Sequence, residues 1–167
     1  MTLLQLVLGS EQVLPVALIR YMDGRNVVET MRFASFIGTK MKTVTSTVRA
    51  SGIGNPDELA TSAYICQIAF FGVDLEREAP TPSHNVGVRC TCPSYFFYFS
   101  HANRLRGCSF GVRFRPYVRR TPLSDPRYPQ KNPSNIPGMC KHLLLVASSL
   151  QHTDFYRSID RDANHSQ

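Results

Sequence analysis

The sequence Val86-Gly-Val-Arg-Cys-Thr-Cys92 alternates apolar and polar residues, which is typical of a β-strand near its end. Side chains two residues apart in an extended chain point to the same side, so Cys90 and Cys92 can face one ion. A second closely spaced pair, Cys140 and His142, lies far downstream. Three thiolates and one imidazole are a ligand set of closed, structural zinc sites. The two pairs therefore predict that the strand end and a downstream segment meet around a metal ion.

Helical spacing follows the second pair. The apolar residues of this run recur at helical intervals, at Leu143, Leu144, Ala147 and Leu150. Pro137-Gly138, just before the run, indicates the start of a helix. Residues two apart on a helix diverge by about 200°, because one turn takes about 3.6 residues. We therefore expect a helix over 141–150, with Cys140 in the turn before it and His142 in its first turn.

The cysteines have two other interpretations. Free cysteines are often small buried apolar side chains. Cys90 and Cys92 are poorly placed to form a disulfide with each other in an extended chain. A disulfide would therefore have to join one of them to Cys140 or Cys108. The odd total of five cysteines argues against a complete disulfide framework, and the two pairs favour a metal, either zinc or iron. Cys66, in an apolar run, is expected in the core, and Cys108 is the one substitute ligand.

The pattern Cys90-x-Cys92 and Cys140-x-His142 resembles the SWIM type of zinc-binding motif, which reads Cys-x-Cys, a variable insert, then Cys-x-His. The longer sequence around these four residues is similar to a group of small tailed-bacteriophage virion proteins that carry a SWIM-like site. It runs Val88-Arg-Cys-Thr-Cys-Pro-Ser-Tyr-Phe-Phe-Tyr-Phe-Ser100 and Asn132-Pro-Ser-Asn-Ile-Pro-Gly-Met-Cys-Lys-His-Leu143. The similarity covers about residues 86–150, and the N-terminal half takes no part in it. The resemblance implies zinc bound by Cys90, Cys92, Cys140 and His142.

The resemblance also implies a structural virion protein of a tailed phage, in the neck, tail or baseplate, that is assembled in the host cytoplasm. Its partners would be other virion proteins in a symmetric assembly. A catalytic zinc keeps one position open, whereas four protein ligands fill the shell. No nucleophile motif, phosphate-binding glycine loop or pair of carboxylates stands out in the sequence. We therefore expect neither catalysis nor a small-molecule substrate.

The insert between the ligand pairs is basic and rich in proline. Eight of the 19 basic residues lie between Arg104 and Lys131, against one acidic residue, and six of the 11 prolines lie between Pro116 and Pro137. Residues 104–136 are therefore expected to form a long loop that contacts partners. Its candidate contact residues are Arg113, Arg115, Arg119, Arg120 and Arg127. Arginine is favoured at protein interfaces, but arginines interleaved with aromatic residues also fit the alternative of a nucleic-acid-binding zinc module.

The expected fold is α+β, in a single domain over residues 1–167, with an N-terminal α+β part (1–85) and a zinc-binding part (86–150). Strands at about 41–50, 63–75 and 85–91 form a small antiparallel sheet, with the His142 helix packed on it. A short helix is expected over 93–104, after Pro93. Residues 1–37 fit either a helix or a strand, and the polar residues 156–167 are expected to form a tail.

Length and composition limit the remaining possibilities. A chain of 167 residues with 43% hydrophobic residues can bury a core of its own, so zinc is not needed to hold the whole fold together. The longest apolar run, Val13–Ile19, is interrupted by Pro15 and is too short to span a membrane. The first residues lack the basic leader and cleavage site of a signal peptide. We therefore expect a soluble protein made in a reducing cytoplasm, where free thiols can bind zinc.

Overall fold

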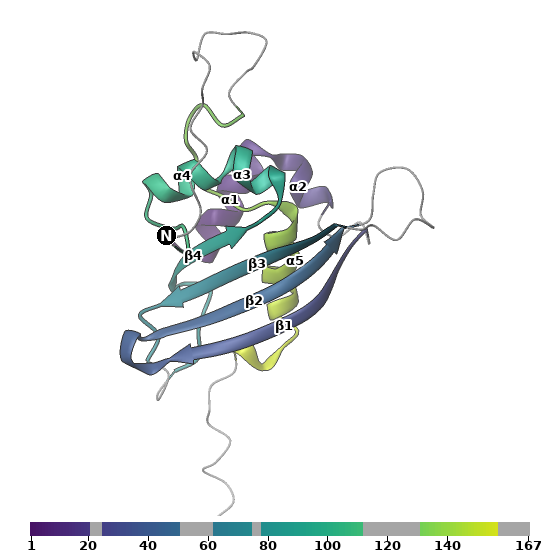
Figure 1. Cartoon of the computed structure of the whole chain (residues 1–167). Coiled ribbons are helices and arrows are strands. Elements are labelled where there is room, and N and C mark those ends of the chain that lie inside the picture. Colours follow the sequence, from purple (N-terminus) through teal and green to yellow (C-terminus); the bar gives the residue numbers. More distant parts are fainter. Residues whose placement is uncertain (21–24, 51–61, 75–77, 112–130, 157–167) are drawn as a thin grey trace, which may run out of the picture.

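The computed structural model describes residues 1–20, 25–50, 62–74, 78–111 and 131–156. They form a four-stranded antiparallel sheet with α-helices along one edge and one face (Figure 1). The strands are β1 Asn26–Phe36, β2 Met41–Ala50, β3 Ser62–Phe71 and β4 Asn85–Cys90, paired in that order. The α-helices are α1 Leu3–Val13, α2 Pro15–Arg20, α3 Pro93–Tyr98, α4 Ser100–Leu105 and α5 Lys141–Leu150. Two 3-10 helices are η1 Ile37–Thr39 and η2 Asp154–Tyr156.

The α+β class and the antiparallel pairing of the three expected strands are confirmed. The strand expected over 63–75 ends at Phe71, because Gly72 turns the chain with a positive φ of 76°. Residues 1–37, which fitted either type of element, contain both: two helices and then the edge strand β1. β1 pairs with β2 with a bulge between Val28 and Thr30. The sheet is therefore one strand wider than the sequence predicted.

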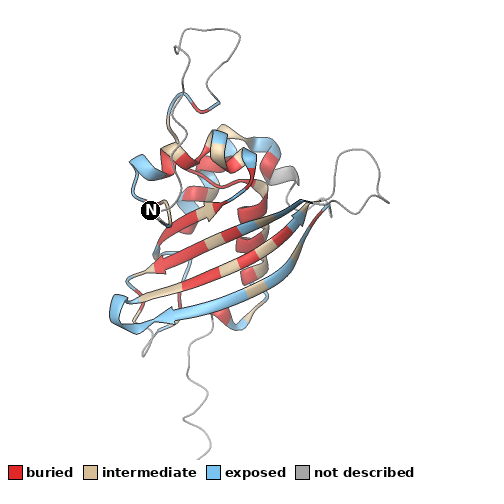
Figure 2. Ribbon diagram, in the orientation of Figure 1, coloured by how far each residue is buried: buried red, intermediate tan, exposed pale blue. Residues whose placement is uncertain are grey.

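The helix α5 covers one face of the sheet, where it contacts β1, β3 and β4 (Figure 1). The core between them includes fully buried side chains from both layers, among them Val44, Ile68, Phe70, Val88, Leu143, Val146 and Leu150. Burial of each such side chain stabilises the fold by about 1.5–3 kcal/mol. Figure 2 shows burial concentrated on β3, β4 and α5, whereas most of β1 is exposed. The best-packed part of the molecule is thus the end where β4 meets the helices.

The helix expected over 93–104 is two short helices, α3 and α4, that join at Phe99. The backbone of Phe99, with φ −122° and ψ −26°, departs from α-helical geometry. Its side chain is fully buried and packs beside Gly138, where an added Cβ would collide with the ring. The break at Phe99, whose ring is buried in the core, therefore divides the expected helix into two.

The expected loop over 104–136 packs on the core at both of its ends, since the buried Asn132 at its second end donates through Nδ2 to Tyr98 O. Leu105 still belongs to α4, and residues 108–110 run beside β4, because Val88 N–H donates to Cys108 O and Phe110 N–H donates to Val88 O. The five candidate arginines fall in residues 112–130 and lie outside the described residues, as do residues 157–167 of the expected tail. Tyr156, the first residue of that tail, belongs to η2. None of the described helices combines the length and apolar character needed to cross a membrane.

Candidate metal centre

Three elements bring the four predicted ligands together. Cys90 is the last residue of β4, and Cys92 is the N-cap residue of α3. Cys140 is the N-cap residue of α5, and His142 lies in the first turn of that helix. All four are buried, and their ligand atoms lie within 4.8 Å of one another. The positions predicted for Cys140 and His142 relative to the helix are therefore confirmed.

The first pair is held by a tight turn from strand to helix. Pro93 occupies the first turn of α3, where its fixed φ favours the start of a helix. Cys92 Sγ accepts the N–H of Tyr95 at 3.3 Å, and Cys90 Sγ accepts the N–H of Cys92 at 3.4 Å. These two bonds fix the turn with both sulfur atoms directed to one point.

The second pair is positioned by α1 and α4. Asn103, fully buried on α4, donates through Nδ2 to Gly138 O and accepts Gly138 N–H through Oδ1, both at 2.9 Å. Ser10 Oγ of α1 accepts the N–H of Met139 at 2.6 Å. These contacts fix the two residues before Cys140, so the backbone delivers that thiol to the cluster in a defined position.

The spacing and the kind of ligand atoms fit a tetrahedral metal ion. Zinc–sulfur bonds of about 2.3 Å and zinc–nitrogen bonds of about 2.0 Å place neighbouring ligand atoms about 3.5–3.8 Å apart. Cys90 Sγ lies 3.9 Å from His142 Nδ1. Thiolate and imidazole ligands select zinc and other thiophilic metals, whereas magnesium and calcium need oxygen ligands, which this group lacks. The cluster can therefore hold a thiophilic ion such as zinc.

Burial and hydrogen bonding shift the pKa values of the three thiols in opposite directions. Burial raises the pKa of Cys90 and of Cys140 well above the ordinary value of a thiol. Hydrogen bonds with the thiols of Cys140 and Cys90 lower the pKa of Cys92 instead. Burial thus opposes the ionisation of two of the three thiols, Cys90 and Cys140. Three buried thiolates require a cation among them, and metal binding supplies it by displacing the protons.

The imidazole of His142 is oriented by an aromatic neighbour. Its ring stacks on Tyr64 of β3, with the centroids 4.7 Å apart and an interplanar angle of 25°. Its Nδ1 lies toward Cys90, while its Nε2 is buried without a hydrogen-bond partner among the described residues. Stacking on Tyr64 is thus the contact that orients this ring within the described part of the chain.

This site is supported by the geometry of its four ligands, and comparison with known proteins adds nothing to it. No protein-family model, curated protein or solved structure matches this chain. The resemblance to phage virion proteins therefore rests on the sequence motif.

The two cysteines outside the pairs take different places. Cys66, predicted in the core, is fully buried, and its Sγ lies 3.6 Å from Cys90 Sγ. This contact was missed, because it depends on the pairing register of β3 with β4. Cys108, considered as a substitute ligand, is not part of the cluster; its Sγ donates to Asn103 O at 3.4 Å. The positioning role of Asn103 also had no signal in the sequence, since its partner Gly138 is distant in the chain.

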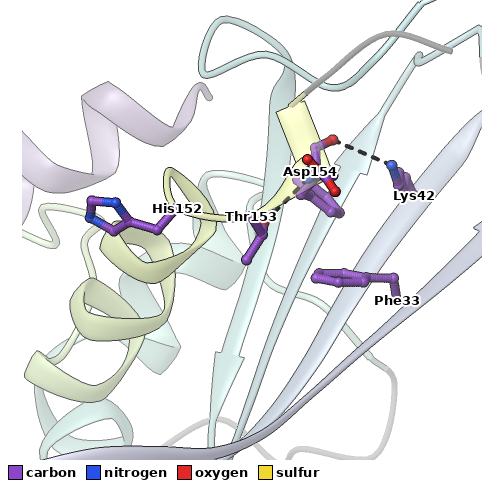
Figure 3. Close-up of a pocket in the computed structure, with 6 residues that line it drawn as sticks. Phe33, Lys42, His152, Thr153 and Asp154 are labelled. Atoms are coloured by element: carbon purple, nitrogen blue, oxygen red, sulfur yellow. Dashed lines mark hydrogen bonds between the residues drawn. The ribbon is translucent and has the colours of Figure 1, made fainter. Parts of the chain in front are cut away.

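A hollow beside η2 is a separate feature of the surface (Figure 3). It is lined by Phe33, Lys42, His152, Thr153, Asp154 and Phe155. Lys42 Nζ donates to Phe155 O at 3.3 Å and lies 4.5 Å from the centroid of the Phe155 ring. Burial lowers the pKa of Lys42. The ammonium thus anchors η2 on the sheet, and the hollow includes none of the predicted ligands.

Proposed function

We propose that this chain is a structural, non-catalytic zinc protein in which the ion ties α3 and α5 to the end of β4. The observation that carries the proposal is the buried set of Cys90, Cys92, Cys140 and His142, with all ligand atoms within 4.8 Å of one another. Four protein ligands complete a tetrahedral shell, so no position stays open for water or a substrate. The ion then acts as a cross-link between elements.

Metal content tests the zinc site. Protein purified without a chelator is expected to contain one zinc per chain by elemental mass spectrometry, and Cys140→Ser is expected to lose it. Cys108→Ser is the matched control, because Cys108 is also a buried thiol but lies outside the cluster, and it should keep its zinc. Iron in the wild type would identify a different cofactor in the same site. A wild type without metal would refute the proposal.

We further propose that the protein is a structural component of a tailed-phage virion, in the neck, tail or baseplate. The support is the sequence resemblance over about residues 86–150. The arginines at 113, 115, 119, 120 and 127 would contact neighbouring virion proteins, because the planar guanidinium pairs with carboxylates in two-pronged geometry. The zinc ligands lie before and after this segment in the sequence. A bound ion would therefore fix the two points at which the segment is joined to the domain.

Particle composition tests the virion role. The polypeptide is expected in purified particles of the phage that encodes it, and Arg119→Glu with Arg120→Glu is expected to reduce its incorporation without loss of bound zinc. A particle that lacks the polypeptide would exclude this role and leave the zinc site untouched.

The net charge of +7 favours nucleic-acid binding as a second candidate function. Binding through several phosphate contacts would weaken by orders of magnitude between low and moderate salt. A titration of the purified protein with single-stranded and double-stranded DNA at low salt distinguishes nucleic-acid binding from the virion role. Lack of affinity under that condition excludes the second candidate.

A further inference from the structure

A fifth thiol lies directly beside the metal ligands. Cys66 of β3 pairs with Cys90 of β4 across the antiparallel ladder, so the two side chains lie on the same face of the sheet. The Cys66 Sγ–H donates to Cys90 Sγ, with the sulfur atoms 3.6 Å apart. Both residues are fully buried. This is a direct contact between a predicted metal ligand and a residue that no ligand motif includes.

Among the described residues, Cys90 Sγ is the acceptor to which the thiol of Cys66 donates. Ser46 is the partner of Cys66 on the other side, across the β2–β3 ladder, and is also fully buried. Ser46 Oγ makes no hydrogen bond within the described part of the chain. The Cys66 proton is thus directed at Cys90, and the register of three strands fixes this direction.

The charge of a loaded site explains why such a donor matters. Three thiolates and a neutral imidazole around a divalent ion carry a net charge of about −1, because each thiolate contributes one negative charge. All four ligands are buried, so water cannot solvate this negative charge. The backbone N–H of Tyr95 donates to Cys92 Sγ, and the N–H of Cys92 donates to Cys90 Sγ. The thiol of Cys66 is a further donor to Cys90 Sγ, from a residue outside the ligand set.

We propose that Cys66 is a positioning residue of the metal centre, an outer-sphere hydrogen-bond donor that stabilises the Cys90 thiolate and thereby sets the affinity for zinc. The proposal rests on the proposed zinc site. Cys66 is not itself a ligand, because the group whose ligand atoms lie within 4.8 Å of one another among the described residues is complete without it. Outer-sphere partners of this kind change metal affinity by about 10–100-fold.

The test compares Cys66→Ala with Cys66→Ser, and uses Cys108→Ala as the matched control. Zinc affinity is measured by competition with a coloured chelator. Cys66→Ala is expected to bind zinc about tenfold more weakly, Cys66→Ser to lie closer to the wild type because its hydroxyl still donates, and Cys108→Ala to match the wild type. Zinc bound by the wild type but with equal affinity in Cys66→Ala would overturn this inference alone.

Cobalt substitution supplies a readout that a packing defect would not move. In Cys66→Ala the thiolate-to-cobalt charge-transfer band is expected at lower energy, because the Cys90 lone pairs lose a hydrogen bond that stabilised them. The ligand-field bands should keep the pattern of three sulfurs and one nitrogen. A change in the ligand-field pattern would show Cys66 to be a ligand and contradict the proposal. Absence of metal binding by the wild type would instead refute the proposed function.

Discussion

Asn103 is the residue through which α4 holds the chain that carries Cys140. Its side-chain amide makes two 2.9 Å hydrogen bonds with the backbone of Gly138, and it is fully buried. Asn103→Ala leaves a buried N–H and a buried C=O unpaired, and we expect it to lower the free energy of unfolding by roughly 2–4 kcal/mol. Zinc affinity should also fall, because Cys140 lies two residues beyond Gly138. Urea unfolding and chelator competition measure the two effects.

Arg104→Ala, at the next and exposed position of α4, is the control for Asn103 and should leave both quantities unchanged. Asn103→Asp keeps an acceptor for Gly138 N–H but sets a buried carboxylate oxygen against Gly138 O, so it should be no more stable than the alanine variant. An alanine variant with the stability of the wild type would show that the clamp on Gly138 is dispensable.

Tyr156 predicts a pH dependence at the other end of the molecule. Its hydroxyl is buried without a hydrogen-bond partner among the described residues, and burial raises the pKa of Tyr156 to about 12. A raised pKa means that the folded state favours the neutral phenol. Its contribution to stability is therefore complete below about pH 10, the ordinary tyrosine pKa, and is lost as the pH rises toward 12.

Tyr156→Phe removes the unpaired hydroxyl and the ionisation together. We expect the variant to be at least as stable as the wild type at neutral pH, and more stable at about pH 11. Thermal unfolding at the two pH values measures this difference. A variant that is less stable at both would reveal a hydrogen bond of this hydroxyl in solution.

Among the elements, α1 is fitted to the segment that precedes the second ligand pair. Gly9 faces Pro137, and an added Cβ would overlap the carbonyl of that residue. Alanine in a helix is ordinarily about 1 kcal/mol better than glycine. At this position we expect the opposite sign, a loss of about 1–3 kcal/mol for Gly9→Ala, because the helix must move away from its neighbour.

Gly38→Ala is the matched control for this prediction, because a Cβ there meets nothing within 4 Å. Denaturant unfolding of the two variants should give a clear loss for Gly9→Ala and little change for Gly38→Ala. A stabilised Gly9→Ala would mean that α1 does not pack on Pro137 in solution.

The elements show what sequence patterns determine and where they stop. β-branched residues and helical spacing predicted β2 and α5, whose bounds are 41–50 and 141–150 as expected. The break at Phe99 was not predictable, because it depends on a ring that packs against the distant Gly138. The edge strand β1 was ambiguous for a related reason: most of it is exposed, so burial imposes little apolar alternation on its sequence. The ligand set was readable because zinc requires residue types at fixed spacing, whereas Cys66 and Asn103 act through tertiary contacts.

Across the whole molecule, the sheet and the helical part, α3, α4 and α5, are held together in different ways. β2 and β3 are joined by a continuous ladder from Met41–Phe71 to Ala50–Ser62. The helices α3, α4 and α5 have six, six and ten residues, and helices of this length are marginal without tertiary contacts. A link between Cys90 and Cys140 closes a loop of about 50 residues, and a covalent link of that length stabilises a fold by about 4 kcal/mol in the loop-closure estimate. Zinc should therefore matter most for the helical part.

Removal of the metal with a chelator is expected to loosen the helical part and spare the sheet. Hydrogen exchange should become faster in α3, in residues 131–140 and in the first turn of α5, while β2 and β3 stay protected. The unfolding temperature should fall by roughly 10 °C, since about 4 kcal/mol is lost in a domain of this size, and should rise with zinc concentration. Cys140→Ser should resemble the chelated wild type and show no further response to chelator. Equal acceleration of exchange in β2 and β3 would mean that the ion holds the entire fold, because a local cross-link cannot release a sheet paired along its full length.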